Sequence, residues 1–142
     1  MLLIGYGNPG RGDDGLGPAF AERIERAALP GVRVMIDYQL TVDHALAVAG
    51  ADRVVFADAL IADEGAFQFK ASAAVTDAEI TSHALSPEAV LTLARTLYDV
   101  TPAAFVLGIT GQDFGEVKEG LSRQAQRNLD DALTFFCDWV AA

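Results

Sequence analysis

Three side chains of this sequence could together bind a divalent metal ion: Asp14, Asp58 and His83. They offer two carboxylate oxygens and one imidazole nitrogen, a set that suits a first-row divalent metal with open coordination positions. These ligand types do not distinguish nickel from zinc or manganese. No short fixed spacing such as His-Glu-x-x-His joins the three residues. The pattern therefore indicates a metal site only if the fold brings the three side chains together.

Short apolar segments alternate with segments of helical period along the chain, which is typical of an α/β fold. The almost wholly apolar segment 53–58 predicts a strand at the centre of the sheet, covered on both faces. The segment 67–70 alternates and carries a charge, so it predicts a strand nearer an edge. The expected strands are 2–4, 32–36, 53–58, 67–70 and 104–109, and the expected helices are about 15–28, 40–49, one opening at Ser86-Pro87 and a last one capped by Ser122.

The inward faces of these helices follow from their apolar spacing. In the second helix Val42, Leu46 and Ala49 are expected to face the core, and His44 is expected on the exposed face. The other buried stripes are expected to be Leu16, Phe20, Ile24 and Ala27 in the first helix, Val90, Ala94 and Leu97 in the third, and Leu121, Ala125, Leu129, Ala132, Phe136 and Val140 in the last.

The candidate side chains all follow strands or precede helices. In an open parallel sheet, functional residues gather beyond the carboxyl ends of the strands. Asp13 and Asp14 follow the first strand, Asp58 ends the third, and His83 precedes the third helix. Residues 110–114 follow the last strand. We therefore expect these segments to converge on one rim of the sheet.

Residues 5–17 contain six glycines, a density that predicts sharp turns or the close approach of another group, such as a partner's peptide. A phosphate-binding loop would also place glycines between a strand and a helix. Asp13 and Asp14 argue against that function, because two carboxylates would repel a phosphate, and no Gly-Lys-Ser/Thr sequence is present. Either carboxylate could instead cap the following helix. One cap needs one carboxylate, which leaves Asp14 free for another role.

Each candidate also has a purely structural interpretation. Asp58 would be partly buried at its strand end and would need a cation or hydrogen-bond donors. His83 alone could be an ordinary polar loop residue. The single cysteine, Cys137, excludes an internal disulfide, and its apolar helical surroundings favour packing over catalysis.

The length, charge and hydropathy of the chain exclude several classes of protein. The 142 residues fit a single domain, 1–142, and the net charge of −10 disfavours nucleic-acid binding. The apolar runs are too short to cross a bilayer, and the first residues lack the pattern of a secretory signal. We therefore expect a cytoplasmic protein. A monomer is expected because the predicted sandwich leaves no large apolar helix face over.

Five motifs in order give the whole chain a resemblance to a known family. The first runs from Gly5-Tyr6-Gly7-Asn8 into Asp13-Asp14-Gly15-Leu16-Gly17-Pro18, and the others are Tyr38-Gln39-Leu40, Ala57-Asp58-Ala59, His83-Ala84-Leu85-Ser86-Pro87, and Gly108-Ile109 with Gly111, Phe114 and Gly120-Leu121-Ser122. This pattern resembles the hydrogenase maturation proteases, nickel-dependent endopeptidases that trim the large subunit of [NiFe] hydrogenases. The family often has glutamate at the position of Asp14.

The resemblance implies a fold and a function. It implies a three-layer αβα sandwich with a mostly parallel sheet of about five strands and one antiparallel edge strand. It also implies that Asp14, Asp58 and His83 are both the metal ligands and the catalytic residues of an aspartic-type endopeptidase. The nickel would arrive with the protein substrate, the hydrogenase large-subunit precursor, and no organic cofactor is implied. Two alternatives stay open: a metal-dependent peptidase or amidohydrolase with another substrate, and a nickel-site checkpoint protein or chaperone that does not cleave.

Overall fold

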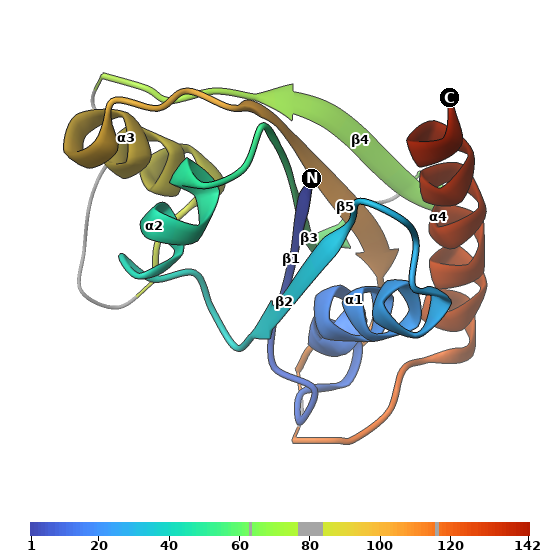
Figure 1. Cartoon of the computed structure of the whole chain (residues 1–142). Coiled ribbons are helices and arrows are strands. Elements are labelled where there is room, and N and C mark those ends of the chain that lie inside the picture. The colour runs from blue at the N-terminus through green and yellow to red at the C-terminus, as the bar shows by residue number, and fades with distance from the viewer. Residues whose placement is uncertain (63, 77–83, 116) are drawn as a thin grey trace.

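The computed structural model describes residues 1–62, 64–76, 84–115 and 117–142, and in it a five-stranded sheet lies between two layers of helices (Figure 1). The expected α/β class and the three-layer sandwich are confirmed. The strands are β1 (Leu2–Tyr6), β2 (Arg33–Asp37), β3 (Arg53–Ile61), β4 (Phe67–Ser72) and β5 (Ala103–Gly111). The helices are the short 3₁₀ helix η1 (Gly12–Gly15), α1 (Leu16–Ala27), α2 (His44–Ala49), α3 (Pro87–Tyr98) and α4 (Arg123–Ala141).

The strand order is β2-β1-β3-β5-β4, which places the apolar β3 at the centre as its sequence predicts. β1 runs parallel to β2 and β3, and β3 runs parallel to β5. β4 is the antiparallel edge strand. The chain leaves β1 for β2 on one side and then crosses to β3 on the other. The gap between the carboxyl ends of β1 and β3 is therefore the topological switch point, where α/β proteins of this kind bind ligands.

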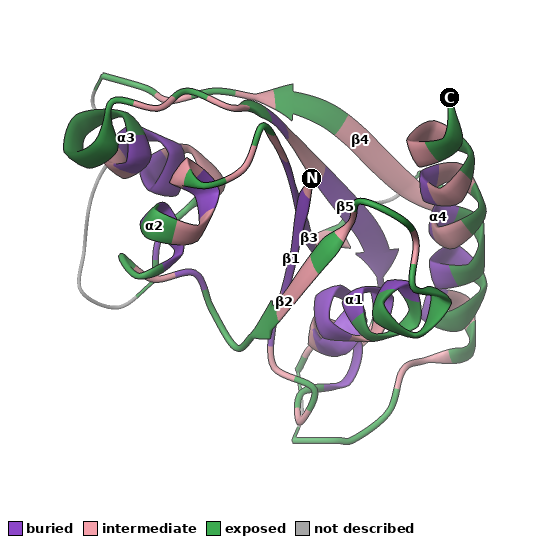
Figure 2. Ribbon diagram, in the orientation of Figure 1, coloured by how far each residue is buried: buried purple, intermediate pink, exposed green. Residues whose placement is uncertain are grey.

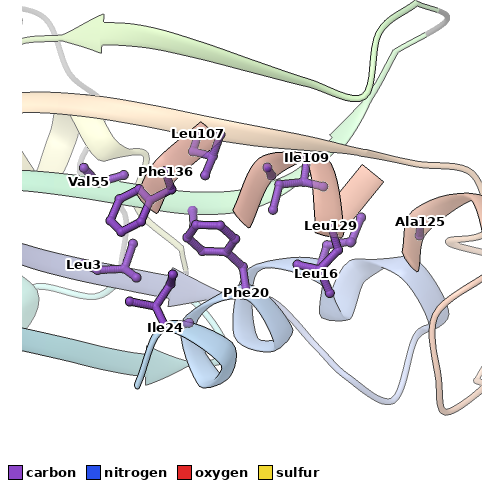
Figure 3. Packing of buried hydrophobic residues seen from close by; sticks show 13 residues of the cluster. Leu3, Leu16, Phe20, Ile24, Val55, Leu107, Ile109, Ala125, Leu129 and Phe136 are labelled. Carbon is purple, nitrogen blue, oxygen red and sulfur yellow. The ribbon is translucent and has the colours of Figure 1, made fainter. Parts of the chain in front are cut away.

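Each face of the sheet has its own apolar core, and Figure 2 shows the buried residues gathered on the strands and on the helix sides that face them. α1 and α4 cover one face, where Phe20 of α1 and Phe136 of α4 meet edge to face with ring centroids 5.3 Å apart (Figure 3). α2 and α3 cover the other face, over Leu2, Ile4 and Phe56. Cys137 is half-buried against the α1/α4 core, in agreement with a packing role.

Serine hydroxyl groups cap the N-termini of two helices, as predicted. The Ser86 Oγ accepts a hydrogen bond from the Ala89 N–H at the start of α3, and the Ser122 Oγ accepts one from the Ala125 N–H at the start of α4. Neither η1 nor α1 has a side-chain cap. The capping role considered for Asp13 or Asp14 is therefore wrong, and both carboxylates have other partners.

The second helix differs most from its prediction. It begins at His44 rather than Leu40, and its buried residues are His44, Ala45 and Val48. Val42 and Leu46 are exposed, at 53% and 62%. Because the first turn predicted for the helix is irregular, the face that points to the sheet is rotated from the one that the apolar spacing indicates. Leu97, expected inside α3, is likewise exposed in its last turn, whereas Val90 and Ala94 are buried.

Within the described residues, the structure contains no helix with the length and apolar character that crossing a membrane requires.

Candidate functional site

The glycine-rich segment after β1 folds tightly back onto the chain itself. The Gly7 N–H donates to the Asp37 carbonyl at the end of β2 over 3.1 Å, and Gly7 has a φ of 141°. A Cβ on Gly7 would overlap the carbonyl oxygen of Asp14. The chain's own backbone therefore approaches this loop closely at Gly7, and the approach of a partner's peptide stays a prediction. The folded loop places Asp14 at the switch point.

The Asp14 side chain is half-buried, and one of its carboxylate oxygens accepts a hydrogen bond. Its Oδ2 accepts the Asn8 N–H over 2.8 Å. Asp14 also lines a cavity of about 240 Å³ together with Arg11 and Phe114. Arg11 belongs to the same loop, whereas Phe114 comes from the segment that follows β5. The cavity thus lies between two segments that are far apart in the sequence.

Asp58 lies on β3 at the first position beyond the pairing with β1, which ends at Gly5 opposite Ala57. It does not end the strand as expected, because β5 continues to pair with β3 as far as Ile61. The Asp58 Oδ1 accepts the Ala59 N–H over 2.7 Å, and the carboxylate is hydrogen-bonded to Tyr6. The need for donors at this half-buried carboxylate is thus met within the chain.

The pKa of Asp58 is raised from 3.8 to about 6. Burial is the main cause, the hydrogen bonds from the Ala59 N–H and from Tyr6 oppose it, and the negative charge of Asp14 raises it further. The structure therefore brings the first two predicted ligands within electrostatic range of each other. The pKa of the Tyr6 phenol is raised as well, first by burial and then by Asp58. Carboxylates whose charges raise one another's pKa are common in active sites.

His83, the third predicted ligand, lies outside the described residues, so its place in the site stays a prediction. The chain after it enters α3 on the face of the sheet to which Tyr6 and Leu40 belong, where the Leu85 N–H donates to the Leu40 carbonyl over 3.1 Å. Among the described residues no three His, Cys, Asp or Glu side chains gather as a metal site. Of the three predicted ligands, the structure therefore describes the positions of Asp14 and Asp58.

Asp13 is fully buried, and its carboxylate accepts a network of hydrogen bonds. Its Oδ2 accepts the N–H groups of Gln112 and Asp113 and the Ser122 hydroxyl, and its Oδ1 accepts the Ser122 N–H. Burial would raise its pKa, but these bonds outweigh burial and hold the pKa below its ordinary value. The sequence signals a structural role for Asp13 but not its partners, which lie about a hundred positions later.

His44, expected on an exposed face, is buried, and that prediction is wrong. Its Nδ1 accepts the Thr41 N–H over 2.9 Å, so the neutral imidazole carries its proton on Nε2. Nε2 faces the Asp37 Oδ2 at 3.3 Å. The Thr41 N–H thus satisfies one ring nitrogen, and the Asp37 carboxylate lies near the other, which makes no hydrogen bond among the described residues.

The described residues form a five-stranded αβα sandwich with two carboxylates, Asp14 and Asp58, near its switch point. Comparison with protein-family models and with curated protein sequences gave no match. Among solved structures, the hydrogenase maturating endopeptidase HybD from E. coli is similar with a TM-score of 0.77 and 21% identity, covering 95% of this chain and 88% of that one. The [NiFe] hydrogenase maturation protease HycI from Thermococcus kodakarensis is similar with a TM-score of 0.74 and 20% identity, covering 99% and 92%.

A third solved structure, the endopeptidase HycI from Escherichia coli, has a TM-score of 0.70 and 20% identity, covering 97% of this chain and 89% of that one. At these identities the likeness establishes the fold. Several hydrogenase maturation proteases therefore share the fold of this chain over nearly its whole length, as the motifs predicted.

Proposed function

We propose that this chain is an endopeptidase that removes a C-terminal peptide from the nickel-loaded large-subunit precursor of a [NiFe] hydrogenase. The observation that carries the proposal is the pair Asp14 and Asp58 at the switch point of a fold that hydrogenase maturation proteases share. Acting on a protein substrate, such an enzyme belongs to the hydrolases.

The two carboxylates suit a divalent cation. Asp58 is desolvated and repelled by Asp14, as its raised pKa indicates. A cation bound by both carboxylates would relieve that repulsion. Carboxylate oxygens bind nickel, zinc and manganese alike, so the choice of nickel rests on the substrate, which carries the ion in. His83 is the residue that we propose as the nitrogen ligand.

The reaction that follows is the hydrolysis of one peptide bond. Contact of Asp14 and Asp58 with the precursor's nickel would hold the adjacent scissile carbonyl at the rim of β1 and β3. A carboxylate of the pair would accept a proton from the attacking water. The water oxygen forms the new bond to the carbonyl carbon, and the amine of the departing peptide takes up a proton.

Replacing Asp14 by asparagine is expected to lower the rate of cleavage by about 100-fold or more, because the variant loses a charge that contacts the nickel. The measurement is intact mass spectrometry of the precursor, with and without nickel, before and after incubation. Asp130→Asn is the matched control, because Asp130 is exposed on α4 with only a long ion pair to Arg23. This control should cleave at the wild-type rate.

Other results would point to the two alternatives. Cleavage of a nickel-free peptide at the same rate would favour a general metal-dependent peptidase or amidohydrolase. A stable complex with the nickel-loaded precursor whose mass never changes would favour a checkpoint protein or chaperone. Wild-type activity in Asp14→Asn would overturn the assignment of the site.

A further inference from the structure

The loop after β1 and the segment between β5 and α4 form one hydrogen-bonded unit. In Figure 1 they lie next to each other below the sheet, in blue and orange. Lys118 bonds to the loop through its backbone twice: its N–H donates to the Gly10 carbonyl over 2.8 Å, and its carbonyl accepts the Gly12 N–H over 2.7 Å. The Asp13 N–H donates to the Asp113 carbonyl over 2.8 Å. These bonds join two backbones but involve no side chain.

The carboxylate of Asp13 also links the loop to the segment after β5, through side-chain hydrogen bonds. It accepts four hydrogen bonds at 2.7 to 3.0 Å, and every donor belongs to the segment that follows β5. Gly111 leaves room for it, since a Cβ there would lie 2.8 Å from the Asp13 Cβ. A buried carboxylate with four donors has one well-defined position. The backbone at position 13 is therefore held from both its N–H and its side chain.

The residues that follow Asp13 and Asp113 in the sequence line the cavity described above. Asp14 directly follows Asp13, and Phe114 directly follows Asp113, whose N–H the Asp13 carboxylate binds over 3.0 Å. Asp14 and Phe114 both line the cavity of about 240 Å³. A shift of the Asp13 carboxylate would thus move two walls of the cavity relative to each other.

We infer that Asp13 is a positioning residue, whose carboxylate holds Asp14 and Phe114 in register so that the cavity accepts the nickel-bearing segment of the precursor. The inference rests on the proposed function for its substrate. Asp13 itself is fully buried and does not touch that substrate. A misplacement of a reacting group by about 1 Å can cost on the order of 100-fold in rate.

Asp13→Asn tests the structural half of this inference without any substrate. The amide keeps the size of the carboxylate but turns a donor toward N–H groups that also donate. Hydrogen–deuterium exchange should therefore accelerate about tenfold or more in peptides that cover residues 111–122. Ile24→Val is the matched control, because it trims the α1/α4 core far from this unit and costs about 1 kcal/mol of stability. It should leave exchange in this segment at the wild-type rate.

Steady-state cleavage tests the functional half. For Asp13→Asn we expect kcat to fall about 10-fold to 100-fold while KM changes by less than about threefold, because Asp13 does not itself touch the precursor and its loss misplaces Asp14. Ser122→Ala removes one of the four bonds and should give a smaller fall in kcat. Ile24→Val should keep the wild-type kcat per folded molecule.

The outcomes separate this inference from the proposed function. If the wild type cleaves no nickel-loaded precursor, the proposed function fails, and the exchange experiment still decides whether Asp13 holds the segment. Unchanged exchange in Asp13→Asn overturns the positioning role. Accelerated exchange with an unchanged kcat overturns it as well, because the bonds would then be structural only.

Discussion

Asp58→Asn is expected to abolish cleavage and yet to make the protein more stable, by about 1–3 kcal/mol at pH 8. The gain arises because the Asp58 charge is unfavourable in the folded chain: burial is the main cause of its raised pKa, and the charge of Asp14 adds to it. Asparagine keeps the shape, can still accept the Ala59 N–H and can donate to the Tyr6 oxygen. Functional groups often carry such a cost in stability.

The sign of the pH dependence follows from the same pKa. The folded chain holds the Asp58 proton more tightly than the unfolded chain, with a pKa of about 6 against 3.8. The contribution of Asp58 to wild-type stability therefore falls as the pH rises from about 4 to about 6, and stays low above that range. The advantage of Asp58→Asn should be full above about pH 6 and should vanish below about pH 4.

Urea unfolding measured through Trp139 gives this difference directly. Trp139 is the single tryptophan and lies against Phe69 and Phe105, so its fluorescence reports the packing of α4 on the sheet. Asp130→Asn is again the control, with no expected gain at any pH. A loss of stability in Asp58→Asn above pH 6 would contradict the interpretation of Asp58 as a strained functional charge.

Much of the fold could be predicted because its signals are local. The apolar segment 53–58 indicates a central strand, and the Ser86 and Ser122 caps are written in the residues next to each helix. The confirmed central place of β3 follows from its apolar pattern, and the edge place of β4 follows from its alternating, charged sequence. The end of β3 could not be predicted from local patterns. Its extension to Ile61 depends on pairing with β5, which lies more than forty positions later.

The error in α2 has a similar origin. The spacing of Val42, Leu46 and Ala49 fits a helical stripe, but three apolar residues define only a weak face in so short a helix. One nitrogen of the buried His44 imidazole accepts the Thr41 N–H, and the Asp37 carboxylate lies near the other. Neither contact is visible in the sequence, since Asp37 belongs to another element.

The different roles of the adjacent residues Asp13 and Asp14 also depend on tertiary structure. The sequence favours a structural role for Asp13 and leaves Asp14 free for another role, but it does not show the partners of either. The structure shows that the Asp13 carboxylate is bound by donors from the segment before α4, whereas Asp14 lines a cavity. The pairing of Asp14 with Asp58 needs the crossover from β2 to β3, which only the topology supplies.

Gly17→Ala is expected to have the largest effect on stability, a loss of about 3 kcal/mol or more. Gly17 lies in the first turn of α1, where the helix rests on the ends of β1 and β3. A Cβ at this position would overlap the carbonyl oxygens of both Tyr6 and Ala57. Both are backbone atoms of paired strands and have no rotamer to change, so the helix must move instead. That movement would also displace η1 and with it Asp14.

Gly50→Ala is the matched control for this change. Gly50 ends α2 with a φ of −85°, and a Cβ there would meet nothing closer than the Ala47 carbonyl at 3.6 Å. We expect its free energy of unfolding to change by less than about 1 kcal/mol. If Gly17→Ala folded with wild-type stability in the same urea titration, α1 would have room to lift from the strands. The first loop would then tolerate a change in the position of Asp14, and the close helix–strand contact at Gly17 would not be what sets the site.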